Sequence, residues 1–233
     1  MLILIHGALG SAAQMAPLAD HLRSTREIHV VELEGHGDTP TAHDAFAIDH
    51  FTDQIRRFLN QHGIERAAFF GYSMGGYVAL RLAAETPNVV SSVATLGTKL
   101  AWSPEVAARE TSRLDPITIR ATVPKFADAL ERRHTGAGGW ETVLSRTAAL
   151  MTELGRQPIV DASVISRITQ PVRLMVGDRD NVVTIDETAS AARGLSSGEL
   201  CVLPATPHPF EQVKIPLLAT VLIDFFDRTR ASA

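Results

Sequence analysis

The run GYSMGG at residues 71–76 places a serine between glycines, directly after an apolar stretch and directly before a helical pattern. It satisfies G-x-S-x-G in the strand-turn-helix setting in which a serine serves as a nucleophile. Glycines are needed there because side chains would collide across so tight a bend. The helix start would aim free N–H groups, that of Met74 first, at an oxyanion formed beside Ser73. The run lacks the patterns of dinucleotide and phosphate loops, so we interpret Ser73 as a nucleophile.

A serine hydroxyl is a weak nucleophile at neutral pH and needs a histidine base, which a carboxylate orients. The apolar stretch at residues 172–176 runs into the segment GDRD, which holds Asp178 and Asp180, and a later apolar stretch leads to His208. The carboxyl ends of parallel strands open on one rim of a sheet. We therefore predict that Ser73, His208 and one of the two aspartates meet there, and the residues alone leave both aspartates open.

Short β-branched or apolar runs alternate with amphipathic helical patterns, which is typical of a parallel sheet covered by helices on both faces. Thr184 and Glu187 have the spacing of a helix capping box, and an apolar helix is predicted from Pro216 to Phe226. The predicted strands are Leu2–Ile5, Ile28–Leu33, Ala67–Phe70, Ser92–Leu96, Val172–Val176 and Glu199–Leu203.

The alternation stops between Gly97 and Thr169, where the patterns are helical and contain no convincing strand. Ser103 followed by Pro104 is typical of a helix start in this region. We predict an α/β core formed by residues 1–97 and 169–233, with a helical cap insertion at residues 98–168.

Five segments in one order resemble the α/β-hydrolase superfamily, and the resemblance covers almost the whole chain. Their order of serine, acid and histidine is the order of that family. The resemblance implies a serine-nucleophile, capped, esterase- or lactonase-like member. The segments are HGALG at residues 6–10, EGHG at residues 34–37, the serine turn at residues 71–76, the spacing Gly177-x-x-Asp180, and His208 followed by Glu211 and Pro216.

The same resemblance implies roles for single residues. Asp180 would be the acid of the catalytic triad, with Asp178 as the fallback. The backbone N–H of Ala8 would join that of Met74 in the oxyanion hole. His6 and His36 are expected to brace their loops rather than to act in catalysis.

One departure from the family concerns the start of the sheet. Family members usually have two further strands before the strand that leads to the His-Gly motif, and this chain begins at that strand. We therefore predict a mostly parallel α/β-hydrolase sheet of six strands, with residues 28–33 at one edge. The oligomeric state stays open.

The cap would close over Ser73 and form the substrate pocket. The expected reaction is hydrolysis of a small carboxylic ester or lactone through an acyl-enzyme intermediate. A carbon-carbon bond hydrolase, a lyase like that of the menaquinone pathway, and a ligand-binding receptor on the same fold are the alternatives. The predicted pocket residues are Leu9, Tyr72, Trp102, Trp140 and Val182; Arg109, Arg113 and Arg120 either bind an anionic substrate or are simply exposed.

The amino-acid composition limits the kinds of molecule that this protein is expected to bind. The 233 residues are 45% hydrophobic and 21% charged, and 22 Lys and Arg against 26 Asp and Glu give a net charge of −4. No basic field exists to hold nucleic acid or an anionic membrane, so a small-molecule substrate is expected. Cys201, the sole cysteine, is predicted to be an inert thiol in a buried strand. Together with an N-terminus unlike a signal peptide, it favours a cytoplasmic protein.

No metal or organic cofactor is expected. Histidines and aspartates gather between His36 and Asp53, but they lack the register of a zinc motif. Asp49 and Asp53 lie where the start of a helix favours acidic side chains anyway.

Overall fold

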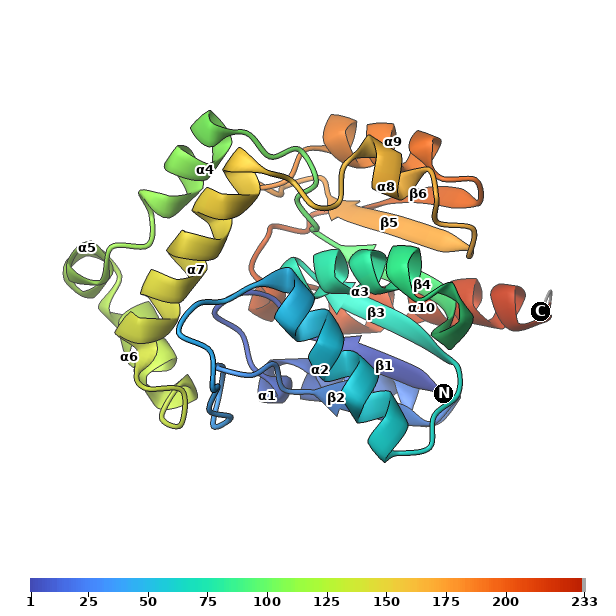
Figure 1. Ribbon diagram of the computed structural model, residues 1–233, viewed down its shortest axis with the longest axis horizontal. Helices are drawn as coiled ribbons and strands as arrows, with labels where there is room; N and C mark the ends of the chain where they lie inside the picture. The colour runs from blue at the N-terminus through green and yellow to red at the C-terminus, as the bar shows by residue number, and fades with distance from the viewer. Residues whose placement is uncertain (232–233) are drawn as a thin grey trace.

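The computed structural model describes residues 1–231, and within them a single sheet of six parallel strands forms the centre of the molecule (Figure 1). The strand order is β2-β1-β3-β4-β5-β6, which places β2 at one edge as predicted and β6 at the other. The predicted fold class is thus confirmed, with strand boundaries that differ by at most two residues. The strands are β1 (Leu2–Ile5), β2 (Ile28–Val31), β3 (Ala67–Tyr72), β4 (Val90–Leu96), β5 (Val172–Gly177) and β6 (Gly198–Leu203).

Helices cover both faces of this sheet because each strand sends apolar side chains to both sides. In β1, Leu2 and Leu4 are fully buried in one apolar layer, whereas Ile3 and Ile5 are fully buried in the other. The first layer packs against α1 (Ala12–Leu22) and α10 (Ile215–Ala231). The second packs against α2 (Ile48–Gln61), α3 (Met74–Glu85) and α9 (Ile185–Gly194).

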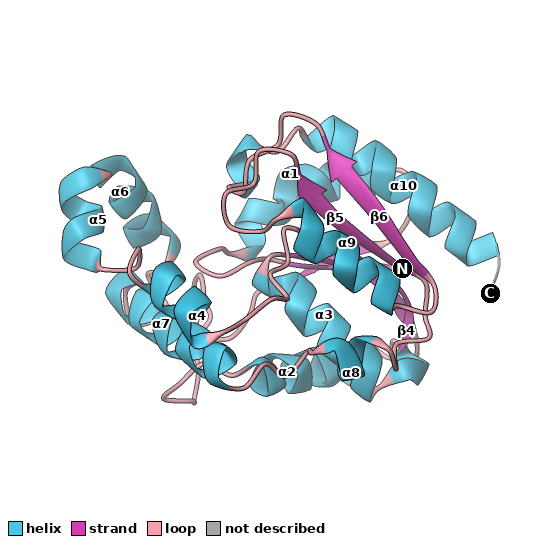
Figure 2. Ribbon diagram, turned by 90° about the horizontal axis from the view of Figure 1, so that it is seen from above, coloured by secondary structure: helices cyan, strands magenta, loops and turns pink. Residues whose placement is uncertain are grey.

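A run of helices connects β4 to β5. Ser103 accepts a hydrogen bond from the Val106 N–H and caps α4, as its sequence suggests. The helices α4 to α7 stand beyond the carboxyl ends of the strands, to one side of the sheet (Figures 1 and 2). The elements are α4 (Pro104–Thr111), α5 (Pro116–Thr122), α6 (Pro124–Arg133), α7 (Trp140–Arg156) and α8 (Ala162–Ile165).

The predicted burial of Cys201 is wrong. Cys201 lies on β6, and the position of this strand at the sheet edge leaves the thiol partly exposed between Leu200 and Val202, which are 42% and 38% exposed. An apolar run cannot reveal whether its strand is central or at an edge, because both contain β-branched and apolar residues. The thiol has a raised pKa because it is partly desolvated, which fits an unreactive group.

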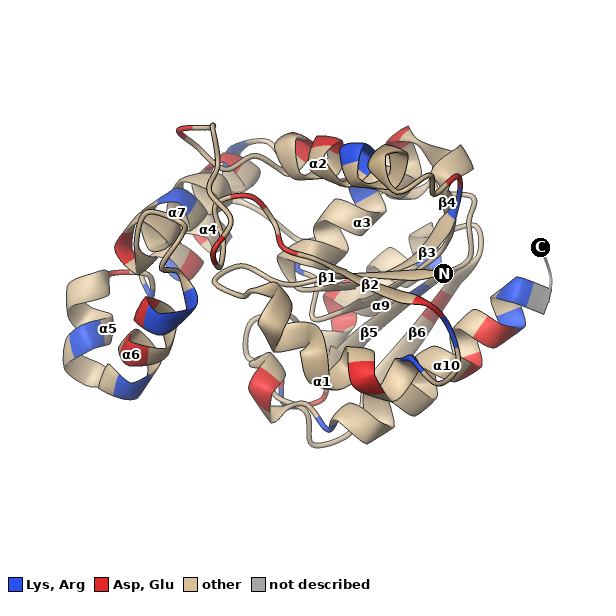
Figure 3. Cartoon of the chain, turned by 90° about the horizontal axis from the view of Figure 1, so that it is seen from below, with Lys and Arg blue, Asp and Glu red and all other residues tan. Residues whose placement is uncertain are grey.

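Charged residues lie mainly on the outer faces of the helices. Acidic and basic residues are interspersed along α2, α6 and α10 (Figure 3). Across residues 1–231, no helix combines the length and the apolar character needed to cross a membrane.

Candidate active site

Ser73 lies in a strained turn between β3 and α3. Its φ of 50° and ψ of −116° place it in the positive-φ region that residues other than glycine rarely adopt. Hydrogen bonds to β4 and to the segment after it help to hold the turn: the Ser73 N–H donates to the Leu96 carbonyl at 2.8 Å, and the Thr98 hydroxyl donates to the Ser73 carbonyl at 3.0 Å. Strain of this kind costs about 1–3 kcal/mol and persists only where the surroundings enforce it.

The glycines of the serine turn make room for close backbone contacts. A Cβ atom on Gly71 would lie 2.3 Å from the backbone of Gly75, and one on Gly75 would lie 2.3 Å from the carbonyl oxygen of Ile5. Neither position tolerates a side chain, so the start of α3 packs directly on β1 and β3.

His208 stands between Ser73 and Asp180. Its Nε2 atom lies 3.4 Å from the Ser73 hydroxyl oxygen, and its Nδ1 atom lies 2.7 Å from Oδ2 of Asp180. Because a carboxylate accepts hydrogen bonds, Nδ1 carries the proton and Nε2 is left to accept one from Ser73. The Tyr72 hydroxyl also donates to the His208 carbonyl at 2.7 Å and thereby fixes the backbone of the histidine.

The Asp180 side chain is only 2% exposed, yet its charge is well compensated. Burial alone would raise its pKa, but the hydrogen bond and charge of His208 and the N–H groups of Val183 and Val182 outweigh burial and lower the pKa. Both amides donate to Oδ1 at 2.8 Å. Asp178 instead accepts a hydrogen bond from the Thr206 N–H at 3.2 Å, so it braces the neighbouring loop.

The loop after β1 lies beside Ser73, and the His6 side chain holds it in place. The Leu33 N–H donates to His6 Nε2 at 3.0 Å, so the His6 proton lies on Nδ1, which donates to the Gly7 carbonyl at 2.8 Å. Ala8 and Leu9 follow and line the cavity next to the serine. His6 thus braces the loop, the structural role that its sequence position predicts.

Residues at the end of α6 also hold this loop. His134 is buried and accepts a hydrogen bond from the Gly37 N–H at Nδ1, 3.0 Å away, so its Nε2 carries the proton and donates to the Leu9 carbonyl at 3.1 Å. Arg133 donates to the same carbonyl at 2.7 Å. Burial lowers the pKa of His134 to about 4 and keeps the ring neutral.

His134→Leu is expected to lower the free energy of unfolding at neutral pH by about 1–3 kcal/mol, because the Gly37 N–H and the Leu9 carbonyl each lose a buried partner. The unfolded chain binds a proton near the ordinary histidine pKa of 6.5, whereas folded His134 resists protonation down to about 4. Wild-type stability therefore falls as the pH drops from 6.5 toward 4, and the variant lacks this contribution. Urea unfolding at neutral and mildly acidic pH measures both effects.

The control for this experiment is His21→Leu, since His21 is exposed on α1. It should leave the stability at neutral pH within about 0.5 kcal/mol of the wild-type value. Burial and the neighbouring His6 and His134 also lower the pKa of His36, so part of the slope remains in either variant. An unchanged midpoint for His134→Leu at neutral pH would contradict the bracing role of His134.

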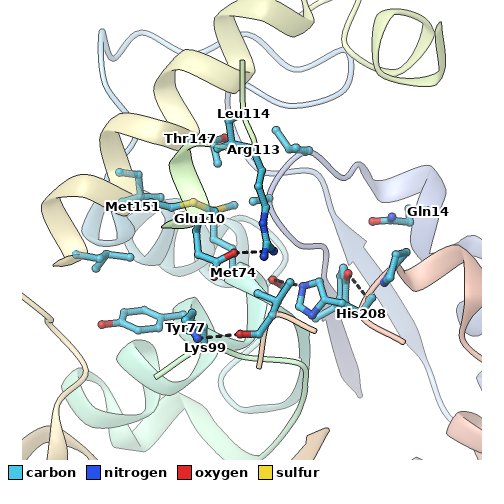
Figure 4. A pocket seen from close by; sticks show the side chains of 18 of the residues that line it. Gln14, Met74, Tyr77, Lys99, Glu110, Arg113, Leu114, Thr147, Met151 and His208 are labelled. Carbon is cyan, nitrogen blue, oxygen red and sulfur yellow. Dashed lines mark hydrogen bonds and ion pairs between the residues drawn. The ribbon is translucent and has the colours of Figure 1, made fainter. Parts of the chain in front are cut away.

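A cavity of about 410 Å³ opens at Ser73 and His208 (Figure 4). Four of the predicted pocket residues line it: Leu9, Tyr72, Trp102 and Val182. The prediction for Trp140 is wrong. Its side chain is 4% exposed and packs with Ile119, Ala127, Leu130 and Leu144 in a separate apolar cluster among the helices.

Sequence reasoning did not foresee most of the charged residues at this cavity. Lys99 lines it and pairs with Glu187 at 3.3 Å, while Glu110 and Arg133 line it from the helices. Of the three arginines left open, Arg113 lines the cavity, whereas Arg120 pairs with Asp128 and Glu131 on the surface. Lys99 did carry a signal, because it follows the carboxyl end of a predicted strand. Arg133 did not, since basic residues are common in the last turn of any helix.

The histidines between His36 and Asp53 pack against neighbouring rings, and Asp49 and Asp53 pair with arginines. The His36 ring stacks on Phe46 with centroids 4.7 Å apart, and the rings of His43 and His50 stack at 3.7 Å. In the part of the chain that the structure describes, no three histidine, cysteine, aspartate or glutamate side chains come together as metal ligands would.

Comparison with known proteins defines the family. A sequence profile of the alpha/beta hydrolase fold family matches residues 1–137, more than half of the chain, and the chain belongs to this family. The pimeloyl-[acyl-carrier protein] methyl ester esterase of Aliivibrio salmonicida is 28% identical over 202 residues, which cover 79% of this chain and 76% of the esterase. The magnesium-chelatase 30 kDa subunit of Rhodobacter capsulatus is 25% identical over 252 residues, covering 97% and 87% of the two chains.

Solved structures show the same fold. The enol-lactonase of Burkholderia xenovorans LB400 superimposes with a TM-score of 0.76 at 18% identity, over 97% of this chain and 90% of the lactonase. The predicted superfamily is confirmed, and so is the prediction of a hydrolase enzyme at the level of this family.

Proposed function

We propose that this protein is a serine hydrolase that cleaves a small carboxylic ester or lactone. The observation that carries the proposal is the line of contacts from Ser73 through His208 to the buried Asp180, beside a cavity of substrate size. This arrangement is that of a nucleophile, a general base and a group that orients the base. The turn that holds Ser73 in a strained conformation supports the same role.

In the proposed mechanism, His208 Nε2 takes the proton of Ser73 as the hydroxyl oxygen attacks the substrate carbonyl. Asp180 holds the imidazole in the correct tautomer and stabilises its cation. The amides of Ala8 and Met74 stabilise the oxyanion of the tetrahedral intermediate, and loss of one such donor typically costs about 100- to 1000-fold in rate. His208 returns the proton to the leaving alcohol, and a water molecule then releases the acyl group from Ser73 by the same steps.

Residues 98–168 act in this proposal as a cap that closes the cavity over Ser73, on a core made of residues 1–97 and 169–233. Trp102, Leu150 and Met151 give the cap wall its apolar character, which suits a partly apolar acyl or alcohol group. The named activities of an esterase and a lactonase among the similar proteins favour an ester or lactone substrate. Apart from the substrate and the hydrolytic water, the proposed steps use only side chains and backbone amides of the chain.

The test is covalent labelling combined with turnover. A fluorophosphonate probe should label the native protein at Ser73, as identified by mass spectrometry of the peptide, and p-nitrophenyl acetate should be hydrolysed. A series of p-nitrophenyl esters and lactones would then define the acid that the cavity prefers. Absence of both labelling and turnover would exclude the proposal, and a ligand-induced melting shift without turnover would instead indicate a receptor.

A further inference from the structure

We infer that Arg113 is a specificity residue that binds a carboxylate carried by the substrate at a distance from the scissile bond. This inference rests on the proposed serine hydrolase function and names its substrate class. The preferred substrate is an ester in which an aliphatic spacer separates the reacting carbonyl group from an anionic end.

The first support is the position of Arg113. It lies just after α4, lines the cavity that Ser73 and His208 also line, and its side chain is half exposed. Figure 4 shows this side chain reaching from the helical wall into the cavity, with the guanidinium beside Glu110 and on the side toward His208. A substrate that extends from Ser73 along this wall can therefore reach the guanidinium.

The second support is the buried carboxylate of Glu110, whose side chain is only 6% exposed. Its Oε1 accepts from both Nε and Nη2 of Arg109, at 3.0 and 2.9 Å, and its Oε2 accepts from Nη1 of Arg113 at 3.2 Å. Arg109 alone matches the charge of Glu110. The pair of arginines around one glutamate therefore leaves a net positive charge, while Glu110 fixes the direction of the Arg113 side chain.

The third support is the difference between Arg113 and the other cations of the cavity. Lys99 is buried and is shared between the Val182 carbonyl and Glu187, whereas Arg133 donates to the Leu9 carbonyl and to Glu211. Both cations therefore already have a carbonyl and a carboxylate of the protein as partners. Within residues 1–231, Arg113 donates one hydrogen bond to Glu110, and its remaining N–H groups are free for an anion.

The aliphatic spacer of the proposed substrate is inferred from the side chains that line the cavity together with Arg113. Apolar side chains supply much of the wall of the cavity that Ser73 and Arg113 share, and they favour methylene groups over further polar ones. Leu114, Leu150, Met151 and Leu154 are among them. The Arg113 side chain is half exposed in the free protein, so a bound carboxylate gains strength from the parallel hydrogen bonds that a planar guanidinium offers rather than from burial of the arginine.

The test compares matched substrates that differ in one charge. On the acyl side, monomethyl adipate is compared with methyl hexanoate; on the alcohol side, 6-acetoxyhexanoate is compared with hexyl acetate. The wild-type protein should prefer the carboxylate in at least one pair. Arg113→Gln should lower kcat/KM for that anionic substrate about 10- to 100-fold more than for its neutral partner, and the extra loss should come through KM.

Arg120→Gln is the matched control, because Arg120 lies in the same helical segment but pairs with Asp128 and Glu131 outside the cavity. It should leave every ratio unchanged. The wild-type preference should also weaken at high salt. Hydrolysis without a preference for the carboxylate in either pair, or a preference that survives Arg113→Gln, overturns this inference alone. Absence of both hydrolysis and fluorophosphonate labelling overturns the proposed function with it.

Discussion

Ser73→Ala is expected to lower kcat for ester hydrolysis by a factor on the order of 10⁶, because the reaction then loses its nucleophile and the base has nothing to activate. Fluorophosphonate labelling should disappear as well. The binding of substrate should change little, since alanine occupies the same turn and the cavity keeps its other walls. The measurements are the turnover of p-nitrophenyl acetate and the mass of the labelled protein. Turnover within tenfold of the wild-type value would exclude Ser73 as the nucleophile.

Ser73→Gly is the companion variant, and it separates catalysis from folding. Both variants lack the hydroxyl, so both should be inactive. The positive φ of residue 73 is strained for alanine and relaxed for glycine, so the glycine variant should be more stable by about 1–2 kcal/mol. Urea unfolding of the two variants measures this difference. Equal stabilities would show that the turn stores no strain at this residue.

The parts of the fold that were predictable are those with local causes. The serine turn combines an apolar strand, glycines at fixed positions and a helical pattern, and the capping box at Thr184 and Glu187 involves residues only three positions apart. Given the strand order of the family, the carboxyl ends of β3, β5 and β6 must share one rim. That constraint suffices to bring Ser73, Asp180 and His208 together without any knowledge of the side chains between them.

The residues that the sequence predicted wrongly or not at all are those whose environment depends on distant parts of the chain. Trp140 lies in the first turn of α7, which packs on α5 and α6, whereas the later turns of the same helix line the cavity, and the apolar pattern of the helix cannot distinguish these two surroundings. Arg113 and Arg120 likewise look alike in sequence. One lies at the cavity and the other on the surface only because of how the helices between β4 and β5 pack. The hydrogen bond from His134 to the Leu9 carbonyl joins residues 125 positions apart, and no local sequence spacing predicts it.

Asp180→Asn should reduce kcat by about 10⁴-fold at neutral pH, and the geometry shows why. Oδ1 of Asp180 accepts from the amides of Val182 and Val183, so the oxygen of an asparagine is expected to remain at that position. Its NH₂ group then faces His208 Nδ1 and donates to it. Nδ1 must become the acceptor, the proton moves to Nε2, and the imidazole can no longer take the proton of Ser73.

Asp178→Asn is the matched control, since Asp178 lies two residues earlier and accepts one hydrogen bond, from the Thr206 N–H, which an asparagine oxygen can also accept. Its kcat should stay within a few-fold of wild type. The pair also tests the electrostatics of Asp180. Because folding lowers its pKa, Asp180 contributes stability above the ordinary carboxyl value of 3.8 that is lost as the pH falls through the lower folded value, and Asp180→Asn should remove that contribution. If Asp180→Asn kept a tenth of wild-type kcat while Asp178→Asn lost most of it, the two aspartates would have to exchange roles, and the contact between Asp180 and His208 would be structural.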